Sequence, residues 1–240
     1  MMRRFCQYLL LGLPLVFLSL AAPRSALAAI VFDDHFTGDS GGMPAGWSRI
    51  AGMGAVVEAG TTVTLGGGPI PGEVAISSDA TIDPGSGTVT IETEFVGIAG
   101  QGASGLFVGP GFPDGALFFC AIQWEGGRIE VNAADVEGGL QWYDVGYLVG
   151  YTGGPIRLTV VLGPASFSVS TDSPPFSSGP IDYTTAFATF TREDLGAAAA
   201  VMLFDYGEGP SIFDRVLVET VGATPVEGMT FGRIKDLYRP

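Results

Sequence analysis

The chain has 240 residues, including 37 glycines and 16 prolines, and its 25 acidic side chains outnumber 11 lysines and arginines, which gives a formal net charge of −14. Binding to nucleic acid or to an anionic membrane surface depends on basic side chains that neutralise phosphates, so this composition argues against both partners. Neutral polymers and divalent cations are the more plausible ligands.

The first 28 residues have the features of a signal peptide. Arg3 and Arg4 provide a positive start, Leu9–Leu20 is an apolar run, and Ala26 and Ala28 are the small residues that precede a cleavage site. We expect cleavage after Ala28, and hence a secreted or cell-envelope protein (periplasmic or extracellular) with no membrane insertion afterwards. A single membrane anchor is the alternative, but the run is shorter than the ~20 apolar residues that a spanning helix needs.

Cleavage would remove three arginines and no acidic residue, which moves the net charge from −14 to −17. Cys120 would then be the only cysteine, so no intrachain disulfide is expected. We predict one β domain over residues 29–221. Residues 222–240 are predicted to be a linker and a short C-terminal tail, in which Thr230–Arg239 forms either a short helix or a frayed end.

Short segments rich in apolar and β-branched residues, separated by Gly, Pro, Asp and Ser, predict a series of strands. Gly115–Trp124 is apolar on both alternating faces, so this strand must be covered on both sides. Thr88–Val96 alternates apolar and polar residues, which predicts one face in water. Thr191–Leu195 is predicted to form one helical turn, and Ala197–Tyr206 a strand despite its alanines. Further strands are predicted at Ile30–Phe36, Trp47–Ala51, Ala55–Glu58, Thr61–Leu65, Glu73–Asp79, Leu106–Val108, Arg128–Asn132, Leu140–Val149, Ile156–Leu162, Ser166–Thr171 and Ser211–Thr220.

Two stretches resemble a known family. Val31–Gly38 followed by Pro44–Trp47 resembles the opening of concanavalin A-like lectin/glucanase jelly rolls, which include laminin-G-like domains, and Phe213–Glu219 resembles their closing strand. The resemblance implies an all-β fold, an antiparallel two-sheet β-sandwich (jelly roll) whose first and last strands are neighbours. It also implies a structural Ca2+ near one edge, for which Asp34 and Asp214 are the candidate ligands. The alternative is that each aspartate caps a turn or pairs with an arginine.

Two motifs of enzymes are present without the context that their chemistry requires. Gly38–Gly42 matches the nucleophile segment of trypsin-like proteases, but the only histidine, His35, lies five residues before Ser40, so no base is positioned for it. Gly100–Gly105 matches a dinucleotide-binding pattern, but the residues after it cannot begin a helix. We interpret both as loops.

Glu92 and Glu94 share one face of a predicted strand, and paired carboxylates are how glycosidases cleave their substrates. The laminarinase branch of the superfamily would show Glu-x-Asp-x-x-Glu on such a strand. Ile91–Val96 lacks that aspartate and the final glutamate, so the pattern favours a solvated strand face.

An aromatic-rich set is the candidate ligand-binding site. Sugars stack on exposed aromatic rings, while hydrogen-bonding groups at the rim fix their orientation. Asp135, Gln141 and Asp144 lie close enough in sequence to form such a rim. Core packing is the alternative for each ring. The candidate ligand-binding residues are Trp124, Trp142, Tyr143, Tyr147 and Tyr151.

These observations predict a secreted, non-catalytic β-sandwich module that binds a glycan or a surface polymer. A structural or adhesive cell-envelope protein is the first alternative. A glycoside hydrolase is the second, and the missing motif makes it the weaker one.

Overall fold

The computed structural model describes residues 28–66, 74–96, 102–111, 117–123, 127–135, 139–149, 151, 154–207 and 209–222. Nearly every element within these ranges is a β-strand. The strands are β1 (Ala28–Asp34), β2 (Trp47–Gly52), β3 (Val56–Ala59), β4 (Thr62–Leu65), β5 (Val74–Ile82), β6 (Thr88–Val96), β7 (Gly102–Gly109), β8 (Leu117–Gln123), β9 (Arg128–Asp135), β10 (Gly139–Tyr147), β11 (Pro155–Leu162), β12 (Ser166–Asp172), β13 (Pro175–Ser177), β14 (Ile181–Asp182), β15 (Ala199–Gly207) and β16 (Ser211–Val221). Three short helices complete the set: η1 (Pro84–Ser86), α1 (Tyr183–Ala186) and η2 (Arg192–Leu195).

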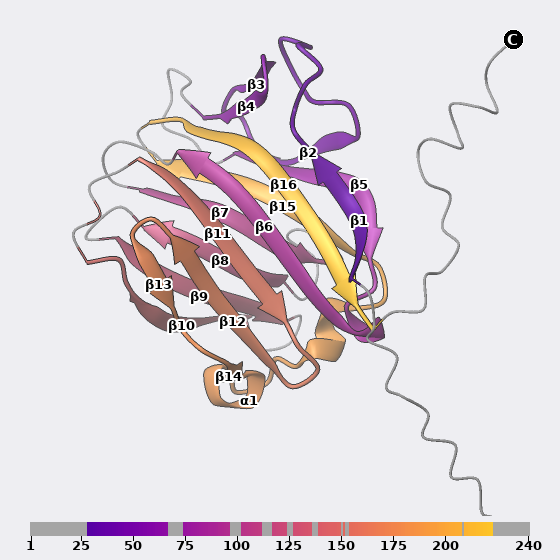
Figure 1. Cartoon of the computed structure of the whole chain (residues 1–240), viewed down its shortest axis with the longest axis vertical. Helices are drawn as coiled ribbons and strands as arrows, with labels where there is room; N and C mark the ends of the chain where they lie inside the picture. Colours follow the sequence, from indigo (N-terminus) through magenta and orange to yellow (C-terminus); the bar gives the residue numbers. More distant parts are fainter. Residues whose placement is uncertain are drawn as a thin grey trace, which may run out of the picture.

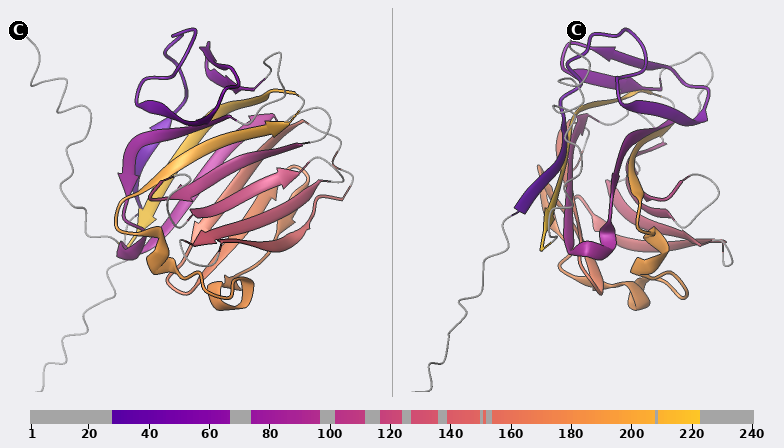
Figure 2. Two further views of the ribbon diagram at one scale, coloured as in Figure 1. Left: turned by 180° about the vertical axis from the view of Figure 1, so that it is seen from behind. Right: turned by 90° about the vertical axis from the view of Figure 1, so that its right-hand side faces the viewer.

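The strands form two antiparallel sheets. Sheet A has the order β13-β12-β11-β6-β16-β4-β3, with β1 beside β16 and β14 beside β12, and sheet B has the order β10-β9-β8-β7-β15-β5-β2. Sheet A faces the viewer in Figure 1, and sheet B faces the viewer in the left view of Figure 2. The right view of Figure 2 shows the two layers from the side. The predicted antiparallel two-sheet sandwich is therefore confirmed.

The core lies between the sheets and follows the period-two alternation of the strands. In β6, Val89, Ile91 and Phe95 are buried, whereas Glu92 and Glu94 lie on the outer face, as their alternation predicts. The ring of Phe95 stacks on that of Phe213 from β16, with centroids 5.1 Å apart. Fully burying one such side chain contributes about 1.5–3 kcal/mol relative to exposure.

The first and last strands are neighbours, as the resemblance implied. β1 pairs with β16 over its whole length, from Ala28 opposite Val221 to Asp34 opposite Val216. The ambiguous alanine-rich segment is strand β15, and η2 is the predicted helical turn, with a capping box between Thr191 and Asp194. β8 lies between β7 and β9 in sheet B. The side chains of Leu117–Ala121 lie outside the described residues, so the prediction that both faces of this strand are covered stays a prediction. The sequence did not predict α1, β13 or β14, which lie between Pro175 and Ala186. The interpretation of Gly100–Gly105 as a loop is wrong for its last four residues, because β7 begins at Gly102.

The two lateral edges of the sandwich are closed by different contacts. At one edge β10 meets β13, where Gly146 lies so close to Phe176 that an added Cβ would be 2.8 Å from the ring. At the other edge β1 meets β2, and the ring of Trp47 packs against Phe32 at 5.8 Å and Phe36 at 5.6 Å. Strands β1 and β10 therefore occupy opposite edges of the molecule.

Candidate functional site

The outer face of β9 and β10 in sheet B carries a compact group of aromatic, charged and amide side chains. Ile129, Val131 and Ala133 of β9 are buried in the core between the sheets, so the alternate residues of this strand face outward. The register places each of them opposite an outward residue of β10. We call this group the β9–β10 platform; its pairs are Asn132 with Trp142, Glu130 with Asp144, and Arg128 with Tyr147.

A bulge in β10 is what brings the two platform aromatics to the same face. Simple alternation would place Tyr147 on the face of Tyr143, opposite to Trp142. The pairing register shifts between Asp144 and Gly146, and the extra residue turns Tyr147 outward. Trp142 and Tyr147 are 57% and 56% exposed, respectively. They lie about 15 Å apart along the strand, so a ligand that contacts both rings must be longer than one sugar unit.

Between the aromatics lies a charged cluster. Arg128 Nη2 lies 2.7 Å from Glu130 Oε1 and also donates to Asp144 Oδ1, so one nitrogen bridges the two carboxylates. The hydrogen bond to Asp144 and the charge of Glu130 raise the pKa of the Arg128 guanidinium above its usual value. Glu130 is buried to 3% exposure, which makes this a largely fixed arrangement rather than a loose surface pair.

Asn132 completes the platform and differs from the other members. Its side chain is fully buried, and among the described residues neither its Oδ1 nor its Nδ2 has a hydrogen-bond partner. Buried amides are normally paired, and leaving one unpaired costs about 1–3 kcal/mol. The platform therefore contains an amide whose hydrogen-bonding capacity the protein itself does not use.

Tyr143 and Tyr151 do not join the platform. Tyr143 faces inward, packs against the core and makes an edge contact with Phe187 at 6.5 Å. Tyr151 is half-buried, and its hydroxyl donates to the Gly154 carbonyl at 2.9 Å; burial raises its pKa to about 12. Trp124 lies outside the described residues. Of the four predicted rings that the structure describes, two lie together on the platform.

The predicted rim is also rearranged. Asp144 is part of the platform, but Gln141 accepts hydrogen bonds from the amides of Ala188 and Thr189, at 2.6 and 3.4 Å, and so holds the loop after α1. Asp135 ends β9, and its side chain lies outside the described set.

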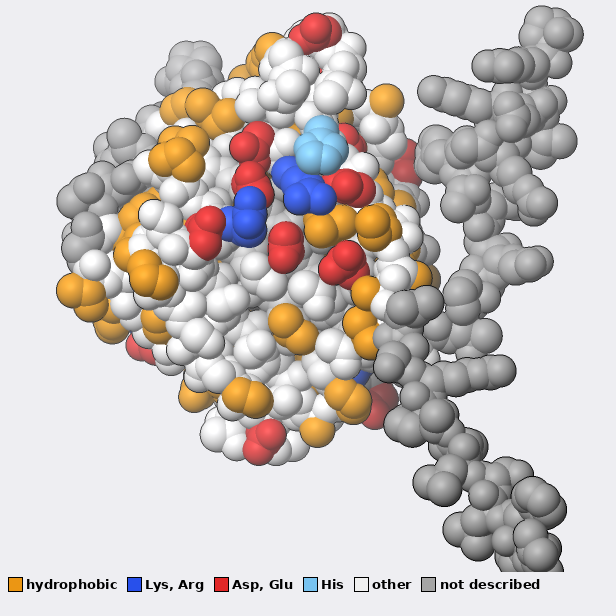
Figure 3. Space-filling view, in the orientation of Figure 1, with side chains coloured by type: hydrophobic (Ala, Val, Ile, Leu, Met, Phe, Trp, Pro, Cys, Tyr) orange, Lys and Arg blue, Asp and Glu red, His pale blue; other side chains and the backbone are white. Residues whose placement is uncertain are grey.

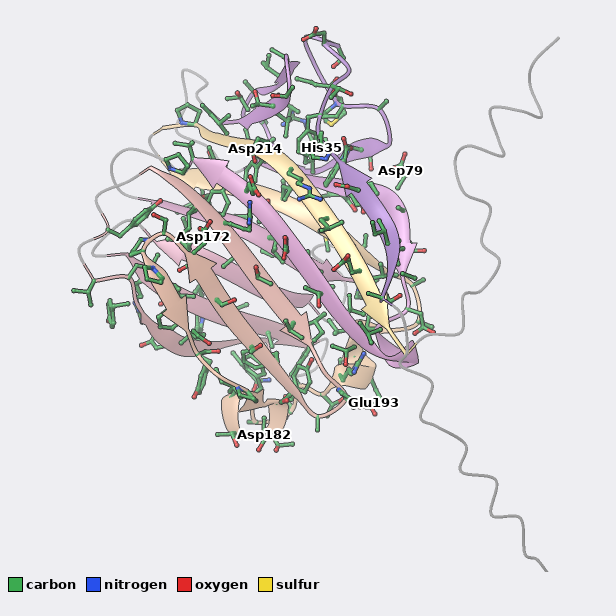
Figure 4. All side chains as sticks on the ribbon, viewed as in Figure 1. His35, Asp79, Asp172, Asp182, Glu193 and Asp214 are labelled. Atoms are coloured by element: carbon green, nitrogen blue, oxygen red, sulfur yellow. The ribbon has the colours of Figure 1, made fainter. Side chains whose placement is uncertain are left out.

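The structure does not bring the two candidate calcium ligands together. Asp34 Oδ1 accepts from the Phe36 amide and its Oδ2 accepts from Trp47 Nε1, each at 2.8 Å, so both oxygens are used inside the protein. Asp214 is exposed and lies near His35 (Figure 4). Over the described ranges no group of three or more His, Cys, Asp or Glu side chains is arranged to hold a metal. The geometry fits the alternative for Asp34, which caps a turn.

Glu92 and Glu94 belong to a stripe of alternating charge across the outer face of sheet A, visible at the centre of Figure 3. Arg157 Nε donates to Glu94 Oε1 at 2.5 Å. Arg215 forms a two-pronged contact with Asp33 at 3.0 and 3.2 Å, which lowers the pKa of that carboxyl. The glutamates are therefore on a solvated face, as expected, and on the opposite sheet from the platform.

The protease-like segment is a loop, as its context predicted. The Glu58 carboxylate accepts hydrogen bonds from the amides of Gly38 at 3.0 Å and Ser40 at 3.2 Å. Ser40 Oγ donates to the Met43 carbonyl, and His35 pairs with Asp33 at 3.3 Å. The serine and the histidine thus have separate structural partners.

Arg128, Glu130 and Asn132 were missed as candidate site residues. The signal was present, because polar residues alternate with apolar Ile129 and Val131, which is the pattern of a strand with one wet face. Nothing in the sequence, however, says that this strand pairs with the one that carries Trp142.

Comparison with known proteins shows similarity in fold only. No protein-family model and no curated protein sequence matches the chain. Among solved structures, an endo-1,3-β-glucanase from Streptomyces sioyaensis aligns with a TM-score of 0.58 at 13% identity, over 85% of this chain and 100% of that one. The laminarinase from Rhodothermus marinus aligns with a TM-score of 0.56 at 9% identity, over 82% and 98%. An immunostimulatory antigen and pseudo β-1,3-glucanase of Mycobacterium tuberculosis aligns with a TM-score of 0.55 at 14% identity, over 80% and 98%.

One further finding concerns membranes: none of the helices in the described part of the chain has the length and apolar character to cross one. Three observations indicate the same fold: the order of the strands, the pairing of the first strand with the last, and these alignments. The chain therefore shares the fold of these structures, an antiparallel two-sheet jelly roll.

Proposed function

We propose that this protein is a secreted, non-catalytic module that binds a neutral glycan through the β9–β10 platform. The observation that carries the proposal is the pairing of two exposed aromatic rings with a fixed polar cluster on one sheet face. Sugar rings present apolar C–H surfaces to aromatic faces and hydroxyl groups to polar side chains, so both parts of the platform have a role. The glucan-related names of several structural neighbours support the same class of ligand.

The charge of the platform favours neutral polymers over sulfated or uronic ones. Arg128 is shared by Glu130 and Asp144, so the cluster carries one net negative charge. The chain as a whole has a formal net charge of −14. Like charges raise the cost of bringing an anionic polymer to this face.

The same cluster argues against glycoside hydrolysis at the platform. A glycosidase places the scissile bond between two carboxyl groups, one of which must carry a proton. Here one nitrogen of Arg128 lies between Glu130 and Asp144 and contacts both. It occupies the position that a glycosidic oxygen would need.

A glycoside hydrolase is still the second candidate, because two of the aligned structures are named as an endo-1,3-β-glucanase and a laminarinase. Incubation with β-1,3-glucan and β-1,3(4)-glucan, followed by a reducing-sugar assay, separates the two functions. We expect no release of reducing ends. Release that disappears in both Glu130→Gln and Asp144→Asn would contradict the non-catalytic proposal.

Binding is tested by retention on immobilised polysaccharides. We expect the mature protein to be retained on at least one neutral glucan, and Trp142→Ala and Tyr147→Ala each to weaken retention roughly fivefold, because a stacked ring is worth about 1 kcal/mol. Tyr206→Ala is the matched control, since Tyr206 is also exposed (60%) on sheet B but lies on β15, four strands from β10.

Retention that is unchanged in the Trp142→Ala/Tyr147→Ala double variant would remove the platform from the proposal. Absence of retention on every polysaccharide, in a folded wild-type protein, would favour the remaining alternative, a structural or adhesive cell-envelope protein. N-terminal sequencing of exported protein, expected to begin at Ala29, tests the proposed secretion.

A further inference from the structure

We infer that Asn132 is a ligand-binding residue of the platform, and that its amide is kept without a protein partner so that it can bind a pair of sugar hydroxyl groups. This inference rests on the proposed glycan-binding function. Nothing in the sequence singled out this residue for that role.

The first argument is energetic. Asn132 is fully buried, and both polar atoms of its amide are unpaired. A buried polar group without a partner destabilises a protein by about 1–3 kcal/mol, whereas an apolar side chain of similar shape carries no such cost. The packing of the protein does not explain why this amide is left unpaired. A ligand that supplies the missing hydrogen-bond partners would explain it.

The second argument is positional. Asn132 lies directly opposite Trp142 on the outward face, and cross-strand neighbours of this kind have Cβ atoms about 4.5–5.5 Å apart. A sugar ring stacked on Trp142 would carry its hydroxyl groups at the edge of the stack, within reach of Asn132. On the same strand, the next outward residue is Glu130, which belongs to the charged cluster.

The third argument is chemical. A carboxamide offers two N–H donors and one carbonyl acceptor, and it carries no charge. Two adjacent hydroxyl groups of a neutral sugar can each donate and accept, so they match an amide better than a phosphate, sulfate or carboxylate would. The ligand class is therefore a neutral glycan with adjacent free hydroxyl groups.

Asn132 is inaccessible in the free protein, so binding requires a side chain to move. The cross-strand neighbours of Asn132 are Phe119 of β8, whose side chain lies outside the described residues, and Trp142 of β10. Trp142 is 57% exposed and makes no hydrogen bond or ring contact with another described residue. Rotation of an exposed side chain takes only picoseconds to nanoseconds. A Trp142 ring that shifts to stack on the ligand would open the amide to it.

The test uses a substitution for which stability and binding should change in opposite directions. In Asn132→Leu an apolar side chain of similar size replaces the unpaired amide. We expect the melting temperature to rise or stay the same, and retention on the glucan bound by the wild type to fall at least tenfold. Asn132→Ala, which cannot overpack the site, is the second variant and should lose retention to the same extent.

Thr93→Val is the matched control. Thr93 is also fully buried with an unpaired hydroxyl, but it lies on β6 of sheet A. Its replacement should raise or preserve the melting temperature and leave retention unchanged.

Two results would overturn the inference. The first is full retention by Asn132→Leu and Asn132→Ala while Trp142→Ala loses retention, which would leave the glycan-binding platform intact and remove Asn132 from it. The second is a marked fall in the melting temperature of both Asn132 variants, which would show a structural role. If Trp142→Ala were retained on the glucan as strongly as the wild type, that result would instead count against the proposed function.

Discussion

Glu58 of β3 forms hydrogen bonds with the loop between β1 and β2 and holds it in place. Its carboxylate is almost fully buried and accepts the amide hydrogens of Gly38 and Ser40. Its own backbone amide donates to the Gly42 carbonyl at 2.9 Å, and its carbonyl accepts from the Gly41 amide at 3.0 Å. A run of glycines suits this arrangement, since a Cβ on Gly38 would lie 2.5 Å from a Glu58 carboxylate oxygen.

We therefore expect Glu58→Gln to destabilise the protein by about 1.5–3 kcal/mol, because hydrogen bonds to a charged acceptor have that value and the new amide NH2 would face a backbone donor. Chemical denaturation measures the change in free energy of unfolding. Glu219→Gln, on the outer face of β16, is the control and should change it by less than about 0.5 kcal/mol. Equal stabilities of the two variants would show that the carboxylate does not hold the loop.

At the scale of elements, the β10 bulge decides which aromatic rings reach the platform. The bulge falls where Gly146 faces Phe176 of β13, and an added Cβ would be 2.8 and 2.9 Å from two atoms of that ring. The lack of a side chain at this position thus lets the edges of the two sheets approach each other while Tyr147 turns outward.

Gly146→Ala should overpack this edge at a cost of about 1–3 kcal/mol, and it should weaken glycan retention although no platform residue is changed. Thermal unfolding should show a melting temperature lower by several degrees. Phe176→Leu in the same chain should recover part of the loss, since it frees space at the contact. If the single variant melts and binds like the wild type, the glycine contact does not control the bulge.

At the scale of the whole molecule, Asp205 lies where the two sheets join. This carboxyl is on β15 of sheet B, is fully buried, and accepts a hydrogen bond at 2.6 Å from Ser211 at the start of β16 in sheet A. Its other oxygen is unpaired and lies against Gly66 at the end of β4. Its register partners, Ser104 and Val74, are uncharged.

Burial raises the pKa of Asp205 from 3.8 to about 7, partly offset by the Ser211 hydrogen bond. The folded protein therefore holds a proton that the unfolded chain has lost between about pH 4 and pH 7, and this carboxyl makes stability fall as pH rises through that window. The change is on the order of 2–4 kcal/mol.

Asp205→Asn removes this titration, so its melting temperature should exceed that of the wild type by more at pH 8 than at pH 4. Differential scanning calorimetry at a series of pH values measures the difference. Asp79→Asn, at an exposed position of β5 (Figure 4), is the control and should follow the wild-type curve. Parallel curves for Asp205→Asn and the wild type would contradict a buried proton at this position.

Much of the fold was predictable, because strand alternation and turn residues are local signals. The wet face of β6 and the helical turn at η2 follow from their own residues. The platform was only half predictable. Trp142 and Tyr147 were candidates, but the bulge that turns Tyr147 outward lies where Gly146 meets Phe176 of β13. Alternation along β10 alone does not predict such a contact. Asn132 enters the site only through its register with β10.

The pairing of Ala28 with Val221 has a practical consequence for how the protein can be displayed. Both ends of the described chain emerge at one corner, beside β1, while the platform lies at the edge formed by β10 (Figure 1). A fluorophore, solid support or fusion partner joined directly at Ala29 or Gly222 would therefore be attached on the far side from the platform. Such a conjugate should work as a polysaccharide probe without redesign of the attachment point.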